Sequence, residues 1–366
     1  MLLFKRFLQQ KHHPIASKPI DRYFEKMVSC FHEMLKEDSM STCKDVAKKA
    51  GVSIASVSRA FRDDVSMKAE TRDKILQIAR EMNYYPNTIA RSLKNKQSRT
   101  VGIIVSNIDN PWYMLVIKHM EKALRKENYR LLIMFDDGEP GTEQETLLQM
   151  MAAQVDGVMF TPLSAKSKDV IQVLQSQGIS LLQLYTQWYE DISAMMIDDE
   201  YGVYIAVRHL LEQGYRRILN VGGNPHSYAR AYAEFGLEPD PKLFLAFGNK
   251  RIENEIENRL TTAQVDAVLA IANEMGTRVI TVFEKLGLSY PRDIGFMMYD
   301  DISWVSMLKI SVIAHPIETV ADMAVRCMLN VIQNSHTSDP GLVHSSIKPY
   351  LIKRQSTQRV LRKDND

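Results

Sequence analysis

Cysteine is scarce in this sequence, and long apolar runs are missing. Only three of the 366 residues are cysteines, Cys30, Cys43 and Cys327, and they lack the spacing of metal ligands. So few thiols predict a reducing compartment without a disulfide framework. No apolar run reaches the roughly 18 residues that a membrane span needs. The N-terminal MLLFKRFLQQ interrupts its apolar residues with Lys5 and Arg6, unlike a secretory signal, so we expect a cytoplasmic location.

Common catalytic motifs are also missing. There is no G-x-x-x-x-G-K-S/T phosphate loop, no G-x-G-x-x-G after the first strand-like run, no H-E-x-x-H and no G-x-S-x-G. The pairs Asp136-Asp137, Asp198-Asp199 and Asp300-Asp301 each follow an apolar run. They are candidates for acid–base groups, for acceptors of ligand hydroxyls or for caps at strand ends. Nothing here demands an enzyme, and nothing predicts a metal or a cofactor.

Charge is nearly balanced over the whole chain but not along it. The formal net charge is +2, yet residues 41–99 hold 13 Lys and Arg against 6 Asp and Glu, a net of +7. The rest of the chain is therefore net acidic. A basic segment on an acidic protein indicates a polyanionic partner, although a solvated basic surface is the alternative.

Three short helices are predicted over residues 42–86. Thr42 and Asp45 have the spacing of a capping box, and Gly51 permits a tight turn. Ser53 is placed to cap a second helix that buries Val57 and Phe61. The third helix is expected over 69–82, before Asn83-Tyr84-Tyr85-Pro86.

The flanking segments are harder to interpret. Residues 21–37 show helical periodicity, which fits a partner-binding or dimer-extending helix. Alternatively, residues 1–40 are a poorly ordered extension or follow an upstream start codon. Residues 87–99 are short, basic and weakly apolar, and they predict a linker.

From residue 101 onward, strand-like runs alternate with amphipathic helices. This alternation predicts parallel sheets covered by helices, and the number of strands indicates two α/β subdomains with a cleft between them. Strands are expected at 101–105, 130–135, 157–160, 180–184, 217–221, 267–271, 294–298 and 311–314. Helices are expected at 112–127, 142–153, 167–177, 201–213, 252–262, 274–286 and 318–333.

The N-terminal motif resembles a known family. TCKDVAKKAGVS at 42–53, followed by SVSR at 56–59, closely resembles the opening IKDVAxxAGVSxxTVSR of the LacI/GalR repressors. Further landmarks keep the family's order, among them NIDNPWY at 107–113, VDGV at 155–158, YDD at 299–301 and KRQST at 353–357. The resemblance covers residues 41 to about 358.

The resemblance implies a helix-turn-helix regulator that binds double-stranded DNA as a homodimer. The helix after Ser53 would be the recognition helix, with early residues meeting base edges in the major groove. Ile54 and Ala55 can contact a thymine methyl, and the fork of Arg59 suits guanine. Ser53, Ser56 and Ser58 would lie beside them as further DNA contacts. The phosphate contacts expected are Cys43, Lys44, Lys68, Thr71 and Asn87.

The same resemblance assigns a hinge helix to the basic linker at 87–99. In the family this segment is ordered on operator DNA, and a leucine enters the minor groove, which bends the duplex. Leu93 and Ala90 match these positions, and Arg91 between them is a further candidate DNA contact.

The ligand side is less regular. By resemblance, Asn107, Trp112, Tyr113, Arg230, Asn273 and Asp300 are the candidate effector contacts. Ala233 and Glu234 replace the glycine and aromatic residue that follow the family's effector-binding arginine. The segment before residues 236–240 is also shorter than in the family, so the helix that carries Arg230 is expected to be truncated. Three alternatives stay open for the cleft: a sugar or sugar derivative, another small metabolite, or no small effector and control by a protein partner.

The expected architecture is thus a helix-turn-helix domain at 41–86, a hinge at 87–99 and a periplasmic-binding-protein-like core at 100–358. We expect subdomain 1 to hold about 100–197 and 300–325, subdomain 2 to hold about 198–299 and 326–358, and 359–366 to be a tail. Two other functional classes are considered. A solute-binding protein would need a secretory signal and no basic helical domain, and both features of this sequence oppose it. An α/β enzyme could use Asp136, Asp198 and Asp300 as acid–base groups.

Overall fold

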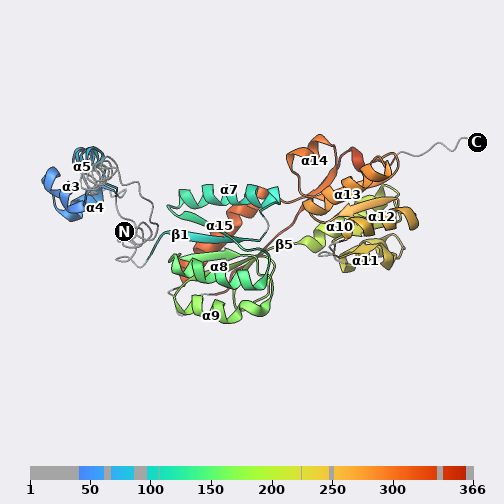
Figure 1. The fold of residues 1–366 in the computed structure, drawn as a ribbon, viewed down its shortest axis with the longest axis horizontal. Coiled ribbons are helices and arrows are strands. Elements are labelled where there is room, and N and C mark those ends of the chain that lie inside the picture. The colour runs from blue at the N-terminus through green and yellow to red at the C-terminus, as the bar shows by residue number, and fades with distance from the viewer. Residues whose placement is uncertain are drawn as a thin grey trace, which may run out of the picture. The chain divides into compact units, whose positions relative to one another are not determined.

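The structure is a computed structural model that describes residues 41–61, 67–85, 97–106, 108–223, 225–246, 251–335 and 341–359. The chain divides into two compact units, Met1–Arg91 and Ser92–Asp366, which are described separately (Figure 1). The helix expected at 21–37 and most of the expected hinge lie outside the described residues.

The first unit holds three short helices, α3 (Cys43–Ala50), α4 (Ile54–Ala60) and α5 (Ala69–Glu81). The expected capping box is present, since the Thr42 hydroxyl accepts from the backbone N–H of Asp45 and the Asp45 carboxylate accepts from the N–H of Thr42. Gly51 ends α3 at φ +71°, a left-handed conformation that favours glycine. These observations confirm the predicted three-helix arrangement and the tight turn within it. A small apolar core joins the helices: Val46, Ala47, Ala50, Val57, Ala60, Ile75 and Ala79.

Sheet A of the second unit has the strand order β11-β5-β4-β3-β1-β2, and all of its pairings are parallel. Its strands are β1 (Thr100–Val105), β2 (Arg130–Phe135), β3 (Gly157–Phe160), β4 (Ser180–Tyr185), β5 (Ser193–Ile197) and β11 (His344–Ile347). Helices α7 (Pro111–Lys126) and α15 (Ile317–Asn334) cover one face, while α8 (Pro140–Ala152) and α9 (Lys168–Ser176) cover the other (Figure 1).

Sheet B has the order β12-β10-β9-β8-β6-β7, with only β12 antiparallel to its neighbour. Its strands are β6 (Ile218–Val221), β7 (Phe244–Leu245), β8 (Ala267–Ala270), β9 (Gly295–Tyr299), β10 (Ser311–Ala314) and β12 (Tyr350–Ile352). Helices α10 (Asp199–Glu212) and α11 (Pro225–Glu234) pack on one face, and α12 (Ile252–Thr262) and α13 (Asn273–Leu286) pack on the other. The short α14 (Ser303–Met307) follows β9. The predicted two α/β subdomains with parallel sheets are confirmed.

The expected division of the subdomains is wrong in its C-terminal part. Strand β10 belongs to sheet B, although residues 300–325 were assigned to subdomain 1. Helix α15 packs on sheet A and β11 joins it, although 326–358 were assigned to subdomain 2. The chain thus crosses between the subdomains three times, after β5, after β10 and after β11. Each crossing is only a few residues long, from Ile197 to Asp199, from Ala314 to Ile317 and from Ile347 to Tyr350.

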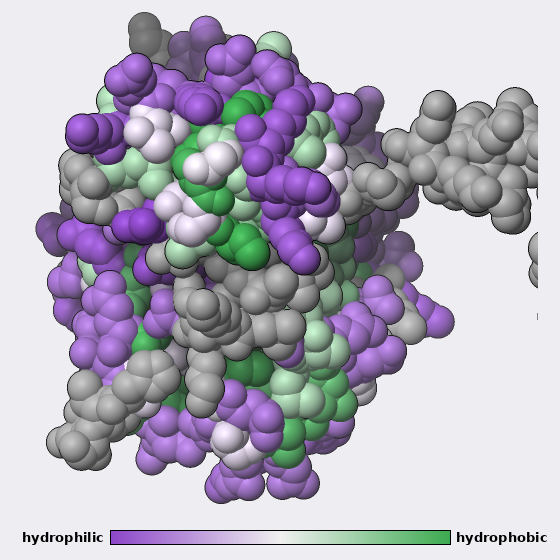
Figure 2. Space-filling view, turned by 90° about the vertical axis from the view of Figure 1, so that its left-hand side faces the viewer, coloured by the Kyte–Doolittle hydropathy of each residue, from purple (hydrophilic) through white to green (hydrophobic). Residues whose placement is uncertain are grey.

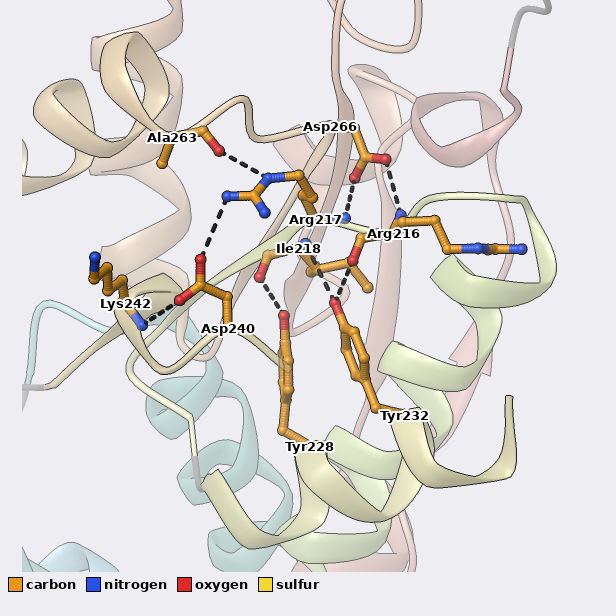
Figure 3. Close-up of polar contacts among 9 residues, drawn as sticks. All are labelled: Arg216, Arg217, Ile218, Tyr228, Tyr232, Asp240, Lys242, Ala263 and Asp266. Carbon is orange, nitrogen blue, oxygen red and sulfur yellow. Dashed lines mark hydrogen bonds and ion pairs between the residues drawn. The ribbon is translucent and has the colours of Figure 1, made fainter. Parts of the chain in front are cut away.

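A cluster of polar contacts lies where strands β6 and β8 of sheet B begin (Figure 3). The Asp266 carboxylate accepts from the backbone N–H groups of Arg216 and Arg217 at 2.8 and 2.9 Å. Tyr232 of α11 donates its hydroxyl to the Arg216 carbonyl at 2.9 Å, and Tyr228 donates to the Ile218 carbonyl. The two tyrosine rings stack with centroids 5.0 Å apart, so this face of α11 is held against β6.

Hydrophilic residues make up most of the face shown in Figure 2, with smaller hydrophobic patches between them. Within the described residues, no helix combines the length and the apolar character that crossing a membrane would require.

The hydrogen bonds of the Tyr232 hydroxyl should contribute measurably to the stability of the fold. It donates to the Arg216 carbonyl and accepts from the Ile218 N–H at 3.4 Å, and the side chain is buried. Tyr232→Phe leaves both backbone groups without this partner, so we expect a loss of about 1–3 kcal/mol in urea unfolding of the full chain. Tyr85→Phe, at a side chain that is 84% exposed, is the control. Equal stability of the two variants would contradict this role.

Candidate nucleic-acid interface and ligand cavity

Helix α4 presents one side to solvent and the other to the small core. Val57 and Ala60 are buried, whereas Ser53, Ile54, Ala55 and Arg59 are exposed. Ile54 is 53% exposed and is one of several large apolar side chains that the described structure leaves open to solvent. An apolar side chain in this position suits contact with a thymine methyl better than it suits water.

Hydrogen bonds order the exposed side of α4. The Ser53 hydroxyl accepts from the Ser56 N–H at 3.1 Å, and the two hydroxyls lie 3.0 Å apart. Arg59 donates through Nη2 to the Ser56 hydroxyl at 3.5 Å, and Ser58 is half-buried. The five predicted base-reading side chains therefore come from one short helix.

The expected phosphate contacts lie on the neighbouring helices. Lys44 is exposed on α3, Lys68 is exposed directly before α5, and Thr71 is half-buried in α5. The Cys43 thiol is half-buried and donates to the Ile54 carbonyl at 3.9 Å, which connects α3 to the start of α4. Asn87, Ala90, Arg91 and Leu93 lie outside the described residues.

A cavity of about 340 Å³ lies between the subdomains of the second unit. Subdomain 1 and its first helix contribute Asn110, Trp112, Tyr113, Tyr185 and Ile197. Sheet B and its connections contribute Asp199, Glu200, Val203, Gly222, Gly223, Ile271, Ala272, Tyr299 and Asp300, and His315 comes from the crossing after β10. The volume falls within the range of about 300–1,000 Å³ that is usual for small-molecule pockets.

Aromatic rings form the subdomain 1 wall of this cavity. The Trp112 ring centroid lies 5.1 Å from that of Tyr113, 5.2 Å from Tyr185 and 5.2 Å from His315, all edge to face. Trp112 is only 5% exposed, and its Nε1 has no hydrogen-bond partner in the described structure. Burial, followed by the charges of Asp300 and Asp199, raises the pKa of Tyr113 to about 12, so the phenol stays neutral.

Charged side chains form the opposite wall. His315 Nδ1 lies 3.0 Å from Asp300 Oδ1, and its Nε2 lies 3.5 Å from Asp199 Oδ1, too far for a well-formed hydrogen bond. Burial lowers the pKa of His315, but the two carboxylates outweigh this effect and raise it to about 9. At neutral pH the ring is therefore an imidazolium held between two carboxylates.

The structure brings together three of the six expected effector residues. Trp112, Tyr113 and Asp300 line the cavity. Asn273 is 4% exposed and lines a neighbouring cavity of about 500 Å³, which Asn110 also lines. Asn107 lies outside the described residues.

The placement expected for Arg230 is wrong. Its side chain is exposed on α11, and its guanidinium lies over the Tyr204 ring, 4.5 Å from the centroid. The reason is the orientation of the helix, since Tyr228, Ala231 and Tyr232 form the buried face of α11 (Figure 3). Arg230 is not among the residues that line the cavity.

Several cavity residues were missed from the sequence. Tyr299 stands in the YDD motif that matches the family, and Asp199 belongs to a carboxylate pair, so a signal existed for these two. The sequence carries no such signal for Tyr185. This residue has a left-handed backbone at the end of β4, with φ +67°, which no sequence pattern predicted.

The three carboxylate pairs do not form one acid–base centre. Asp136 accepts from the Gly138 N–H, Asp198 caps α10 through the Tyr201 N–H, and Asp301 accepts two hydrogen bonds of 2.8 Å from Arg354. Only Asp199 and Asp300 share the cavity. Among the described residues, no group of His, Cys, Asp or Glu is arranged to hold a metal ion.

Comparison with known proteins identifies the family. The profile described as "Bacterial regulatory proteins, lacI family" matches residues 42–87, and that of "Periplasmic binding proteins and sugar binding domain of LacI family" matches residues 98–339. The chain belongs to the LacI family of bacterial regulatory proteins. The resemblance seen in the sequence is thereby confirmed.

Relatives within the LacI family match over nearly their full length. The chain is 26% identical to catabolite control protein A of Staphylococcus xylosus, covering 87% of this chain and 99% of the relative. It is 28% identical to the ribose operon repressor of Haemophilus influenzae, covering 87% of this chain and 98% of the relative. Among solved structures, the lac repressor dimer bound to operator and the anti-inducer ONPF is similar in fold, with a TM-score of 0.72, 19% identity and coverage of 87% and 99%.

The raised pKa of His315 predicts a pH-dependent stability of this LacI-family core. A group whose pKa is higher in the folded state stabilises the fold fully below its ordinary pKa of 6.5, and this stability is lost as the pH rises through about 9. Between pH 6.5 and pH 9, we expect the free energy of unfolding of the wild type to fall by up to about 3 kcal/mol more than that of His315→Gln. This difference would be seen as a steeper fall of Tm with pH in the wild type. The exposed His344→Gln is the control. Parallel pH profiles of His315→Gln and wild type would contradict the assignment.

Proposed function

We propose that this chain is a repressor that binds a pseudo-palindromic operator as a homodimer, with an affinity controlled by a sugar-like molecule in the core cavity. The observation that carries the proposal is the pairing of a solvent-exposed recognition face on α4 with a cavity built at the chain crossings of the core. We infer that it acts in the bacterial cytoplasm, on the nucleoid.

DNA reading is divided between two kinds of contact. Ile54, Ala55 and Arg59 are assigned to base edges, with Ser56 and Ser58 beside them. Their exposure on one side of α4 supports this assignment. Lys44 and Lys68, together with Cys43 and Thr71, are assigned to phosphates, which fix the position of the domain without reading sequence.

Control by a ligand follows from the position of the cavity. Because the cavity is lined by both subdomains and by the crossing residue His315, a bound molecule would contact both subdomains at once. Relatives support a sugar-like ligand: one is a ribose operon repressor, and a structure 24% identical in sequence is that of a CelR–cellobiose complex.

The core also holds the end of the hinge directly. The Asp156 carboxylate accepts from the backbone N–H groups of Ser98 and Arg99 at 2.6 and 2.9 Å. A displacement of this part of subdomain 1 would therefore move the C-terminal end of the hinge. Ordering the hinge costs roughly 1–2 kcal/mol of backbone entropy per residue, so a small displacement can decide whether it forms.

Selection of bound DNA from a random pool tests the proposed operator. We expect the full-length chain to enrich a pseudo-palindrome, because two modules related by symmetry read two half-sites. A pool without any enriched symmetric sequence would overturn the proposed dimeric reading of DNA.

Two substitutions separate base reading from phosphate contact. Arg59→Ala should weaken binding to the selected operator by about 1–3 kcal/mol and relax the preference at one base pair. Lys44→Ala should weaken binding about equally on all sequences and reduce the salt dependence by about one counterion. Both are measured by fluorescence anisotropy with operator and scrambled duplexes. A uniform loss for Arg59→Ala would argue against its contact with a base.

Leu93→Ala tests the minor-groove wedge. We expect a much larger loss of affinity for the operator than for unrelated DNA, because only the specific complex orders the hinge and bends the duplex. Lys94→Ala is a matched control in the same segment, and it should affect both DNAs through charge alone. An equal loss on both DNAs for Leu93→Ala would count against the wedge.

A further inference from the structure

A second cavity, the inner pocket, has a volume of about 200 Å³ and lies within subdomain 1. The carboxyl ends of β1 and β4, the segment after β3 and helix α7 all contribute to its lining. Six of the lining side chains are aliphatic: Ile103, Ile104, Val105, Ile117, Leu163 and Leu184. Charged residues line the cavity between the subdomains, whereas the described lining of the inner pocket includes none.

The inner pocket lies at a topological switch point of sheet A. Strands β1 and β3 are parallel neighbours, and Ile104 pairs with Phe160 near their carboxyl ends. The helix that follows β1, α7, packs on one face of the sheet, whereas α9, which follows β3, packs on the other (Figure 1). Because the two connections leave on opposite faces, a crevice remains between them, and open α/β sheets bind ligands in such a crevice.

Two tyrosines form a wall that the inner pocket shares with the cavity between the subdomains. Tyr113 and Tyr185 line both spaces, and their ring centroids lie 5.8 Å apart, edge to face. The backbone of Tyr185 is left-handed although this residue ends a strand rather than a helix. Such a conformation is unfavourable for a residue other than glycine, and residues strained in this way cluster at ligand-binding sites and switch regions. The two spaces therefore meet at rings that are held in place against backbone strain.

The lining selects an apolar occupant. A charged group would lose its hydration there without gaining a partner, which is strongly unfavourable. A water molecule needs about two to four polar partners, but besides the two tyrosines only Ser106 and Thr161 bring polar side chains to the described lining. An engineered apolar cavity of about 150 Å³ in another protein stays dry and binds benzene. The inner pocket is therefore large enough for a group of that size.

We propose that the inner pocket is a binding site for a neutral apolar group, about the size of a single phenyl ring or a short alkyl chain. Such a group comes either from the effector, as a substituent on its hydroxylated part, or from a separate small molecule. Recognition is the same in both cases, because the group is removed from water and contacts the aliphatic side chains. Binding in this pocket goes beyond the proposed function, whereas an effect of this binding on DNA rests on it.

Calorimetry on the full-length protein tests the pocket with benzene. Benzoate and benzylammonium carry the same ring with a negative or a positive charge. We expect benzene to bind at least about 10-fold more tightly than either ion, because the described lining offers no partner for a charge. Equally tight binding of either ion, or no binding of benzene up to its solubility, would overturn the proposal.

Two filling variants locate the bound benzene. Ile117→Phe and Leu163→Phe each place a ring in the inner pocket, so we expect each to lower benzene affinity at least about 10-fold. Ile171→Phe is the matched control, because Ile171 is also buried but packs in the core on the other face of sheet A and does not line the pocket. Unchanged benzene affinity in both filling variants would contradict the assignment to this pocket.

Thermal unfolding of the same variants tests whether the inner pocket is open. A ring that enters an empty space keeps or raises Tm, whereas a ring forced into a packed core lowers it. We expect Ile117→Phe to stay within about 2 °C of the wild-type Tm or to exceed it, and Ile171→Phe to lower Tm by about 2–4 °C or more. An equal fall of Tm in both variants would show that the space beside Ile117 is already filled.

Glycosides distinguish the two sources of the apolar group. The probes are the methyl and phenyl β-glycosides of glucose, galactose and ribose. If the group belongs to the effector, at least one phenyl glycoside should bind at least about 10-fold more tightly than its methyl counterpart, and Ile117→Phe should remove this gain. If benzene binds but no phenyl glycoside shows the gain, the group comes from a separate small molecule.

Anisotropy with operator DNA separates this proposal from the proposed function. If benzene or a phenyl glycoside binds in the inner pocket but leaves operator affinity unchanged, the pocket stands and control of DNA binding through it fails. If a sugar alters operator affinity while benzene does not bind, ligand control stands and the inner pocket fails as a binding site.

Discussion

The contact of His315 with Asp300 and Asp199 is the interaction on which the geometry of the cavity depends. His315 stands in the crossing after β10, Asp300 follows β9 with a left-handed backbone at φ +72°, and Asp199 begins α10. Edge-to-face contact with Trp112 extends the cluster into subdomain 1. One imidazolium thus connects both subdomains, because the carboxylates keep it charged where burial alone would neutralise it.

Short chain crossings make this cluster a control point. Three segments join the subdomains, and each leads from one sheet directly into an element of the other. A rotation of one subdomain must therefore be absorbed near Asp199, His315 and the turn between β11 and β12. Asp156 of subdomain 1 holds Ser98 and Arg99 at the C-terminal end of the hinge, so subdomain 1 is directly bonded to the segment that leads to the DNA-binding unit.

The sequence predicted elements that have a strong local pattern. The capping box at Thr42, the turn at Gly51 and eight core strands all appear where periodicity and capping residues placed them. Four strands were missed, and each is short or weakly patterned: β5 is SAMMI, β7 has two residues, β11 is HSSI and β12 is YLI. Helix α14 was also missed, and α11 was expected only through the resemblance, as the helix that carries Arg230. Subdomain membership after residue 300 depends on strand pairing across long separations, which no local pattern encodes.

The cavity illustrates the same limit. Trp112, Tyr113 and Asp300 were found through motif order, whereas the orientation of Arg230 was decided by the tyrosines that flank it on α11.

If a ligand in the core controls DNA binding, it must change the affinity of the protein for its operator. This is tested by measuring the operator Kd of the full-length protein with and without a compound that stabilises the core in a screen of sugars, amino sugars, sugar phosphates and nucleobases. We expect a change of about 5–150-fold in operator Kd, with unrelated DNA little affected. An unchanged operator Kd for every compound that binds the core would contradict it.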